Sequence, residues 1–173
     1  MSLMSSVEMS DELAKLSAEL HSRLGDEFAL IGVYTGGAHL ARRLLSRLEG
    51  AGHPRPQLGT MDITLYRDDL YTGLEKPVLG ETDIPFDIND RGIVLVDDVL
   101  FTGRTVRAAL NQLMDYGRPR WVKLLVLVDR GHRELPIAPD FVGIQIDTAK
   151  LDRVEVRLSE EGQEDGVFLE RAR

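Results

Sequence analysis

Residues 94–105 read VLVDDVLFTGRT, in which an apolar run ends in two adjacent carboxylates and continues into a Thr-Gly-Arg-Thr loop. The apolar residues Ile93 to Val96 predict a buried strand, and residues 104–116 predict a helix closed by Gly117 and Pro119. Open α/β sheets are built from such strand, loop and helix units, and their ligands bind beyond the carboxyl ends of the strands. The loop after this strand is therefore the first candidate for a functional site.

The rest of the chain repeats the alternation of apolar strands and amphipathic helices. Ser10, followed by two acidic residues, predicts the start of a first helix that ends at Gly25, and leucines from Leu40 to Leu48 mark a second helix. Further predicted strands span residues 28–34, 58–66, 121–128 and 141–146, and a two-stranded C-terminal ribbon spans residues 154–158 and 167–169. Strands that are apolar throughout predict a parallel sheet covered by helices on both faces, which is an α/β fold.

The bulk composition predicts one domain, residues 1–173, without a membrane span. The chain is long enough for a substantial core, and its apolar runs fall far short of the roughly 20 residues that cross a bilayer. The absence of cysteine excludes disulfides and thiolate catalysis and favours a cytoplasmic protein, and a net charge of -8 argues against nucleic-acid binding. Residues 1–9 are expected to be disordered or an addition to the natural chain. The polar segment 67–90 is long for a plain connection, which predicts a mobile lid.

The opening stretch combines groups that suit one phosphorylated, hydroxyl-bearing ligand. Asp97 and Asp98 repel an anion, whereas the loop from Thr102 to Thr105 offers backbone amides, a glycine and two hydroxyls to a phosphate. A sugar phosphate with Mg²⁺ meets both requirements, and a capped strand and turn is the structural alternative. A P-loop nucleotidase and a dinucleotide-binding fold lack support, because the sequence contains neither G-x-x-x-x-G-K-[ST] nor G-x-G-x-x-G.

Four ordered motifs resemble the PyrR family of type I phosphoribosyltransferases. They are DITLYRDDL at 62–70, DDVLFTGRTVRAAL at 97–110, GRP at 117–119 and VLVDRGHRELPI at 126–137, and the second is similar to the phosphoribosyl pyrophosphate (PRPP) motif. Members of the family are uracil phosphoribosyltransferases that, in many bacteria, also bind pyrimidine-operon mRNA. The resemblance implies a central, mainly parallel sheet flanked by helices, a small hood at residues 129–150 and a C-terminal β-ribbon. It also implies Mg²⁺-dependent conversion of uracil and PRPP into UMP and pyrophosphate by a homodimer or higher homo-oligomer.

The resemblance also implies the roles of individual residues. Asp97 and Asp98 would contact the ribose hydroxyls and, through water and PRPP, the Mg²⁺ ion, and Arg67 would be the cation for pyrophosphate. The loop Thr102–Thr105 would hold the 5'-phosphate, and the loop Thr35–Gly37 would hold pyrophosphate. The predicted substrate-binding residues are Thr35, Gly36, Gly37, Thr64, Tyr66, Val99, Leu100, Phe101, Thr102, Gly103, Arg104, Thr105, Asp129 and Arg130.

Three of these segments have a purely structural alternative. A plain strand-to-helix turn would explain Thr35–Gly37, and a solvated charged turn would explain the stretch around Arg67. Asp129 and Arg130, which match the start of the hood, would equally suit an ion-paired loop. Phe101 favours uracil over purines, because purine-using relatives place an acid just before Thr-Gly to meet a ring nitrogen, and an aromatic ring cannot do so.

The chain also departs from the family pattern. Thr35-Gly36-Gly37 stands where the family has Thr-Arg-Gly, so a cation near the pyrophosphate is missing. The expected RNA-binding face keeps Arg133, whereas Ala138 and Ile144 occupy positions that carry basic residues in the family. Since phosphate contacts supply most of the affinity for RNA, these changes argue against operon-RNA binding. In the N-terminal helix, the matching positions Ala14, Lys15 and Ala18 replace Thr, Arg and His.

Two other functions remain as alternatives to the uracil phosphoribosyltransferase. One is a UMP-sensing mRNA-binding regulator with little catalysis, and the other is a phosphoribosyltransferase for another base. The four histidines show no metal-binding spacing, and His21, His39 and His53 are interpreted as surface or packing residues.

Overall fold

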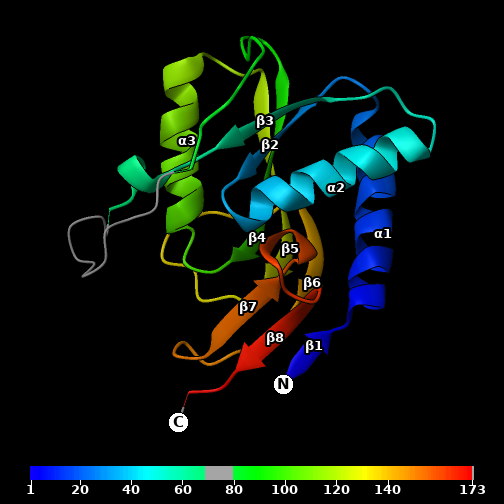
Figure 1. Ribbon diagram of the computed structural model, residues 1–173. Coiled ribbons are helices and arrows are strands. Elements are labelled where there is room, and N and C mark those ends of the chain that lie inside the picture. Colours follow the sequence, from blue (N-terminus) through cyan, green and yellow to red (C-terminus); the bar gives the residue numbers. More distant parts are fainter. Residues whose placement is uncertain (69–79, 173) are drawn as a thin grey trace.

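The computed structural model describes residues 1–68 and 80–172, and it contains a central five-stranded sheet (Figure 1). The strands follow the order β3-β2-β4-β5-β6, and every neighbouring pair is parallel. Their bounds are β2 (Ala29–Val33), β3 (Gln57–Met61), β4 (Gly92–Leu100), β5 (Trp121–Asp129) and β6 (Phe141–Gln145). The predicted parallel sheet is confirmed.

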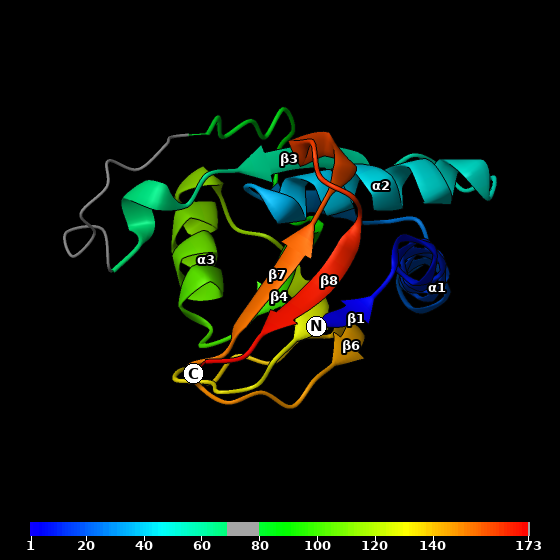
Figure 2. The same cartoon turned by 60° about the horizontal axis from the view of Figure 1, so that its bottom comes forward.

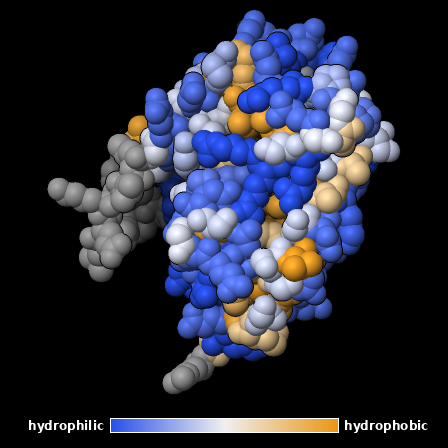
Figure 3. All heavy atoms as spheres, turned by 45° about the vertical axis from the view of Figure 1, so that its right-hand side comes forward, coloured by the Kyte–Doolittle hydropathy of each residue, from blue (hydrophilic) through white to orange (hydrophobic). Residues whose placement is uncertain are grey.

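Helices cover both faces of this sheet, as the apolar strands predict. Helices α1 (Ser6–Leu24) and α2 (Gly36–Gly50) lie on one side, and α3 (Arg104–Tyr116) lies on the other (Figure 1). Leu13, Leu16 and Leu20 of α1 are almost completely buried. Burial of each such side chain contributes roughly 1.5–3 kcal/mol relative to exposure, so the leucine stripe holds α1 against the core. The outward side of α1 and α2 is mainly hydrophilic, with its apolar residues in separate groups (Figure 3).

A small antiparallel sheet lies beside the main one. It contains β1 (Ser2–Met4), β8 (Gly166–Glu170) and β7 (Arg153–Arg157) in the order β1-β8-β7, and Figure 2 shows it in front of the main sheet. A short 3-10 turn, Ser159–Glu161, lies in the connection between β7 and β8. The predicted C-terminal ribbon is therefore confirmed, with one additional strand from the N-terminus.

Residues 1–9 are ordered, so the prediction that they are disordered is wrong. β1 pairs with β8, and Met9 is fully buried. Helix α1 begins at Ser6 rather than near Ser10, because Ser5 and Glu8 form a reciprocal capping box. The side chain of Ser5 accepts a hydrogen bond from the Glu8 amide, and the Glu8 carboxylate accepts one from the Ser5 amide, which satisfies two amides that the helix leaves free.

Two strands have different ends from those predicted. β3 stops at Met61, and residues Thr64–Tyr66 form a 3-10 turn instead of the end of a strand. β4 continues to Leu100, so Asp97 and Asp98 lie inside the strand rather than after it. The reason is pairing with β5, which continues along β4 to Leu100 beyond the last residue pair with β2.

The predicted lid and hood are only partly separate from the sheet. Of the lid, residues 69–79 lie outside the described part of the chain, whereas residues 80–90 return to the core: Asp83 pairs with Thr60, and Ile88 is 1% exposed. Of the hood, residues 141–145 form β6 of the main sheet. Among the helices of the described residues, none combines the length and apolarity of a membrane span.

Candidate active site

A cavity of about 300 Å³ opens at the end of β4, beside the first turn of α3. It joins residues from two separate sequence motifs: residues 62–70, which lead into the lid, and residues 97–110, which contain the end of β4 and the start of α3. The lining residues are Arg67, Asp68, Asp97, Val99, Leu100, Phe101, Thr102, Gly103, Arg104, Thr105 and Val106. The predicted residues from Val99 to Thr105 therefore lie together with Asp97 and Arg67.

The start of α3 has the free amides of a potential anion site. Gly103 is the N-cap of α3 with φ +93, a left-handed conformation that L side chains rarely adopt. Because the cap is a glycine, it offers no side-chain oxygen to the helix, and in residues 1–68 and 80–172 no acceptor contacts the amides of Gly103, Thr105 or Val106. The Arg104 amide donates to the Thr102 hydroxyl at 3.3 Å. Free amides at the positive end of a helix form a site for a phosphate group.

The two carboxylates of β4 face different surroundings. Asp97 lines the cavity and is 6% exposed, and its Oδ1 accepts a hydrogen bond from the Asp98 amide at 2.9 Å. Burial, together with the negative charge of Asp98, raises the pKa of the Asp97 carboxyl well above its ordinary value. Asp98 accepts a hydrogen bond from the Val99 amide at 2.8 Å and faces the loop before α2. Asp97 thus faces the side of the sheet that α3 covers, and Asp98 faces the start of α2.

The segment Thr35–Gly37, which is the N-cap and the first two residues of α2, packs directly on β4. A Cβ at Gly37 would lie 2.2 Å from the Val96 carbonyl oxygen, so this position requires glycine. A Cβ at Gly36 would lie 2.5 Å from Asp98 Oδ2, so a larger residue there requires the Asp98 side chain to move. Thr35 caps α2 without a side-chain hydrogen bond. Over the described parts of the chain, the amides of Gly36 and Gly37 have no acceptor either, so this loop is a second potential anion site next to the acids.

The start of the lid is attached to α3 by ion pairs. Asp68 lies 2.6 Å from Arg104 and 3.7 Å from Arg107, and Arg104 also contacts Glu134 at 2.9 Å. These contacts join the lid start to the first turn of α3. Asp68 and Arg107 were missed by the sequence analysis, although the spacing of Arg104 and Arg107 places both on one side of a helix.

Two predicted site residues of the lid start lie outside the lining of this cavity. The Thr64 hydroxyl donates to Asp62 at 2.5 Å, and the Tyr66 hydroxyl donates to Asp115 on α3. The Tyr66 carbonyl accepts a hydrogen bond from Arg107 at 3.1 Å. In this conformation both residues shape the lid start, and Arg67 alone of the three reaches the cavity.

Phe101 forms an aromatic wall at the end of β4. The guanidinium of Arg130, a residue only 6% exposed, lies 4.0 Å from the centre of the Phe101 ring, and His132 meets the same ring edge-on at 5.9 Å. Arg130 is held there by hydrogen bonds to the carbonyls of Ala149 and Lys150. The wall therefore presents an aromatic ring and a fixed cation, which suits a flat, polar heterocycle.

Asp129 and Arg133 form the ion pair of the hood. Arg133 Nη2 donates to Asp129 at 2.5 Å, and its other nitrogens donate to the carbonyls of Phe101 at 2.9 Å and Ile137 at 3.0 Å. The ion-paired-loop alternative thus describes Asp129, whereas Arg130 contacts the aromatic wall. Arg133 uses its donors inside the protein, which makes it a poor candidate for RNA contact.

Comparison with known proteins assigns the chain to a family. The phosphoribosyl transferase domain family matches residues 3–161. The chain is 51% identical to the bifunctional protein PyrR of Deinococcus radiodurans, over 96% of this chain and 92% of the relative. It is 53% identical to the bifunctional protein PyrR of Roseiflexus sp., over 84% of this chain and 80% of the relative.

Solved structures share the fold at much lower identity. A hypoxanthine phosphoribosyl transferase of Trypanosoma cruzi superposes with a TM-score of 0.74 at 18% identity, covering 99% of this chain and 91% of that one. A hypoxanthine-guanine phosphoribosyltransferase of Bacillus anthracis gives a TM-score of 0.68 at 19% identity, covering 84% of this chain and 83% of that one. These superpositions establish the type I phosphoribosyltransferase fold. The sequence relatives, at about half of the residues identical, establish the family: the chain belongs to the PyrR family of phosphoribosyltransferases.

Proposed function

We propose that this protein transfers the phosphoribosyl group of PRPP to uracil, giving UMP and pyrophosphate. The observation that carries the proposal is the position of Asp97 and Asp98 between two loops with free amides, Thr102–Val106 and Thr35–Gly37. PRPP has a phosphate at one end, a pyrophosphate at the other and hydroxyls between them. The amides at the start of α3 match the phosphate, the two acids match the hydroxyls, and the amides at the start of α2 match the pyrophosphate.

The chain's own groups support a dissociative displacement. The bond from the anomeric carbon to the pyrophosphate oxygen breaks, with the electron pair leaving on oxygen, and the same carbon bonds to a ring nitrogen of uracil, which releases its proton to water. Because the transition state resembles an oxocarbenium ion, orientation and stabilisation of the leaving group lower the barrier. The α3 amides hold the 5'-phosphate, the amides of Gly36 and Gly37 face the pyrophosphate, and Arg67 adds a cation to it.

Mg²⁺ suits the same edge of the sheet. Two neighbouring carboxylates and the oxygens of PRPP are the hard ligands that this ion takes, and a cation would offset the charge of the buried Asp97. When bound, the ion would neutralise the departing pyrophosphate. Asp97 and Asp98 would hold it through water and PRPP.

The residues around Phe101 favour uracil as the base. Phe101 offers a ring for stacking, Arg130 lies on that ring, and Phe101 itself occupies the position before Thr-Gly where purine-using relatives place an acid. Regulation of pyrimidine genes through mRNA is a second candidate, favoured by the name bifunctional protein that the relatives carry. A cytoplasmic homodimer or higher homo-oligomer is proposed from the same resemblance.

A substrate panel tests the proposal. Purified protein is incubated with PRPP and uracil, orotate, guanine or hypoxanthine, with Mg²⁺ or with EDTA, and products are separated by chromatography. We expect UMP only with uracil and Mg²⁺, and a loss of at least about 100-fold in kcat for Asp97→Asn, with Asp11→Asn as an exposed control. Turnover of a purine would overturn the base assignment. Absence of UMP together with UMP-dependent retardation of operon leader RNA would favour the regulator.

A further inference from the structure

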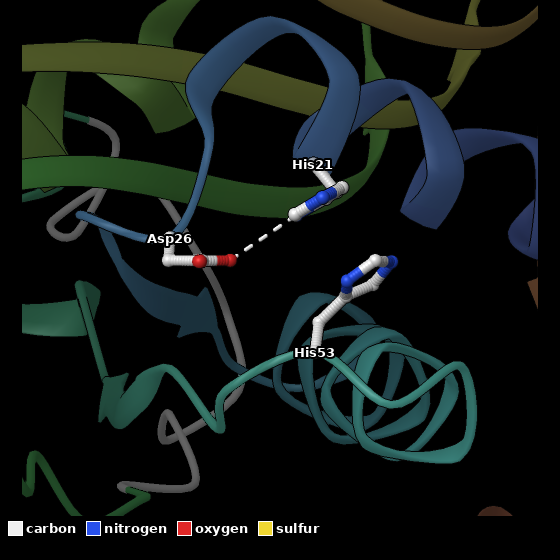
Figure 4. A group of neighbouring side chains, drawn as sticks. All are labelled: His21, Asp26 and His53. Atoms are coloured by element: carbon white, nitrogen blue, oxygen red, sulfur yellow. Dashed lines mark ion pairs between the residues drawn. The ribbon is translucent and has the colours of Figure 1, made fainter.

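A second group of chemistry-bearing side chains lies at the opposite edge of the main sheet, where β2 and β3 begin. His21 lies in the last turn of α1, Asp26 precedes β2, and His53 follows α2 (Figure 4). Two tight turns bring them together, because Gly25 and Gly52 adopt φ values of +66 and +83 directly after α1 and α2. The group is independent of the site proposed for PRPP, which lies at the carboxyl ends of the strands.

The three side chains converge. The carboxylate of Asp26 lies 3.2 Å from His21 Nδ1, and the rings of His21 and His53 stack with their centres 3.5 Å apart and an angle of 18° between planes (Figure 4). One nitrogen or oxygen atom from each residue lies within 4.8 Å of the others. Sequence spacing gave no sign of this arrangement, because turns at two distant helix ends create it.

The His21 ring has an unused nitrogen at this point. Its Nδ1 atom is buried, and within residues 1–68 and 80–172 it has no hydrogen-bond partner, because the contact to Asp26 lacks hydrogen-bonding angles. A buried nitrogen without a hydrogen bond is costly, and its one polar contact, to Asp26, joins it to a carboxylate, which is itself a metal-ligating group. Two imidazoles and a carboxylate converging on such an atom are a ligand set for a transition metal.

We propose that His21, Asp26 and His53 bind a divalent transition-metal ion, with Zn²⁺ as the best match, and that the ion joins the end of α1 to the turn between α2 and β3. Imidazole nitrogens suit Zn²⁺, Co²⁺ and Ni²⁺, whereas Mg²⁺ takes oxygen ligands. Three protein ligands leave the fourth position of a tetrahedron to water. The ion is therefore chemically distinct from the one proposed beside Asp97 and Asp98.

Metal binding requires a small, defined adjustment. Zn–N bonds of about 2.0–2.1 Å place the ligand atoms of a tetrahedral site about 3.4 Å apart, which is closer than the widest spacing seen here. The metal must also lie in the plane of each ring, so the stacked imidazoles have to tilt apart. Side chains of His21 and Asp26 are 34% and 48% exposed, which leaves room for these rotations.

A metal at this place would stabilise the folded chain, because the three ligands meet only after α1, α2 and the sheet have assembled. An ion that binds the native state and not the unfolded chain stabilises the protein by RT ln(1 + [L]/Kd), so the melting temperature rises with the free ion concentration. The effect is separable from catalysis, since the PRPP site lies at the other edge of the sheet.

Titration of the full, chelator-treated chain with Co²⁺ and Zn²⁺ tests the site. We expect visible Co²⁺ absorption bands typical of tetrahedral coordination, a rise in Tm with Zn²⁺, and displacement of Co²⁺ by Zn²⁺ but not by excess Mg²⁺. His53→Ala and His21→Gln should each weaken Co²⁺ binding by roughly tenfold or more. His39→Ala, which changes a histidine on α2 outside the group, should bind as the unaltered protein does.

Folding of each variant is checked by circular dichroism and by retained transfer of phosphoribose, which the proposal leaves unchanged in His53→Ala. The proposal is overturned if the unaltered protein shows neither Co²⁺ bands nor a Zn²⁺-dependent Tm shift. It is equally overturned if His53→Ala binds as tightly as His39→Ala, or if Mg²⁺ displaces the Co²⁺, since the ion would then occupy the site beside Asp97.

Discussion

The carboxylate of Asp98 occupies the place where a side chain at position 36 would begin. A Cβ at Gly36 would lie 2.5 Å from Asp98 Oδ2 and 2.8 Å from its Cγ. The glycine that begins α2, where the PyrR pattern has arginine, therefore leaves room for the carboxylate of Asp98 on β4.

This close approach predicts that Gly36→Arg lowers activity even though it restores the family residue. The new Cβ forces Asp98 or the loop to move, and a displacement of about 1 Å in such a site costs up to about 100-fold in rate. We expect kcat/KM for PRPP to fall at least about tenfold, measured by steady-state kinetics.

Gly50→Ala is the matched control for Gly36→Arg, because Gly50 ends α2 and a Cβ there meets nothing within 4 Å. It should leave kcat/KM unchanged. Higher activity of Gly36→Arg than of the unaltered chain would mean that the lost cation matters more than the position of Asp98.

Gly103→Ala should weaken PRPP binding. Its φ of +93 strains any L side chain, and relief of that strain turns the loop amides away from the phosphate. We predict a loss of about 1–2 kcal/mol in the free energy of unfolding, together with a KM for PRPP raised at least about fivefold.

Gly162→Ala separates the expected rise in KM from the expected loss of stability. Gly162 has φ +76 in the connection between β7 and β8, with nothing within 4 Å of a Cβ, so it carries similar strain away from the cavity. A comparable loss of stability with an unchanged KM is expected there. Equal KM effects in both variants would argue that general strain, not the phosphate loop, is responsible.

Arg43 should make stability depend on acid pH. Arg43 on α2 pairs with Glu160 and with Asp165 at 2.7 Å, and hydrogen bonds from its guanidinium lower the pKa of both carboxyls in the folded chain. A carboxyl with a lowered folded pKa stabilises the protein above its unfolded pKa of about 4, and this stabilisation is lost as the pH falls through the folded pKa.

We therefore expect Arg43→Met to reduce the free energy of unfolding by about 2–3 kcal/mol at pH 7 and by less as the pH falls below about 4, measured by urea unfolding across pH. Lys15, which is exposed and pairs with Glu12 at 3.0 Å, provides the comparison: Lys15→Met should change stability by less than about 1 kcal/mol. An equal loss for Arg43→Met at pH 7 and at pH 3 would contradict the ion-pair explanation.

Arg133→Ala should destabilise the hood. It leaves Asp129, which is 7% exposed, without its guanidinium partner and removes hydrogen bonds to the carbonyls of Phe101 and Ile137. An unpaired buried carboxylate costs about 3–5 kcal/mol, so thermal unfolding should show a large fall in Tm.

Arg118→Ala, an exposed arginine, is the control and should change the free energy of unfolding by less than about 0.5 kcal/mol. If Arg133→Ala keeps its Tm but loses retardation of leader RNA, then Arg133 acts at the RNA and not in the hood.

Much of the architecture follows from local patterns. Apolar runs such as Leu124 to Val128 can be satisfied only inside a sheet covered on both faces, and glycine at the ends of leucine stripes limits the helices. The anion loop at Thr102–Thr105 was also predictable from local sequence, because the amides at the start of a helix have no partner within the helix. The family motifs added the order of the binding segments.

Contacts between distant segments decided the rest. β1 exists because β8 pairs with it, β4 reaches Leu100 because β5 continues the ladder, and Asp97 and Asp98 face different loops because of their places in that strand. His21 and His53 meet only because two helices end at the same edge of the sheet. The sequence by itself determined the main helices and the strands of the parallel sheet, and where an anion can bind, since these depend on residues close in the chain. Only the tertiary structure decided which side chains share a site, because strand pairing and helix packing join residues whose spacing along the chain carries no such information.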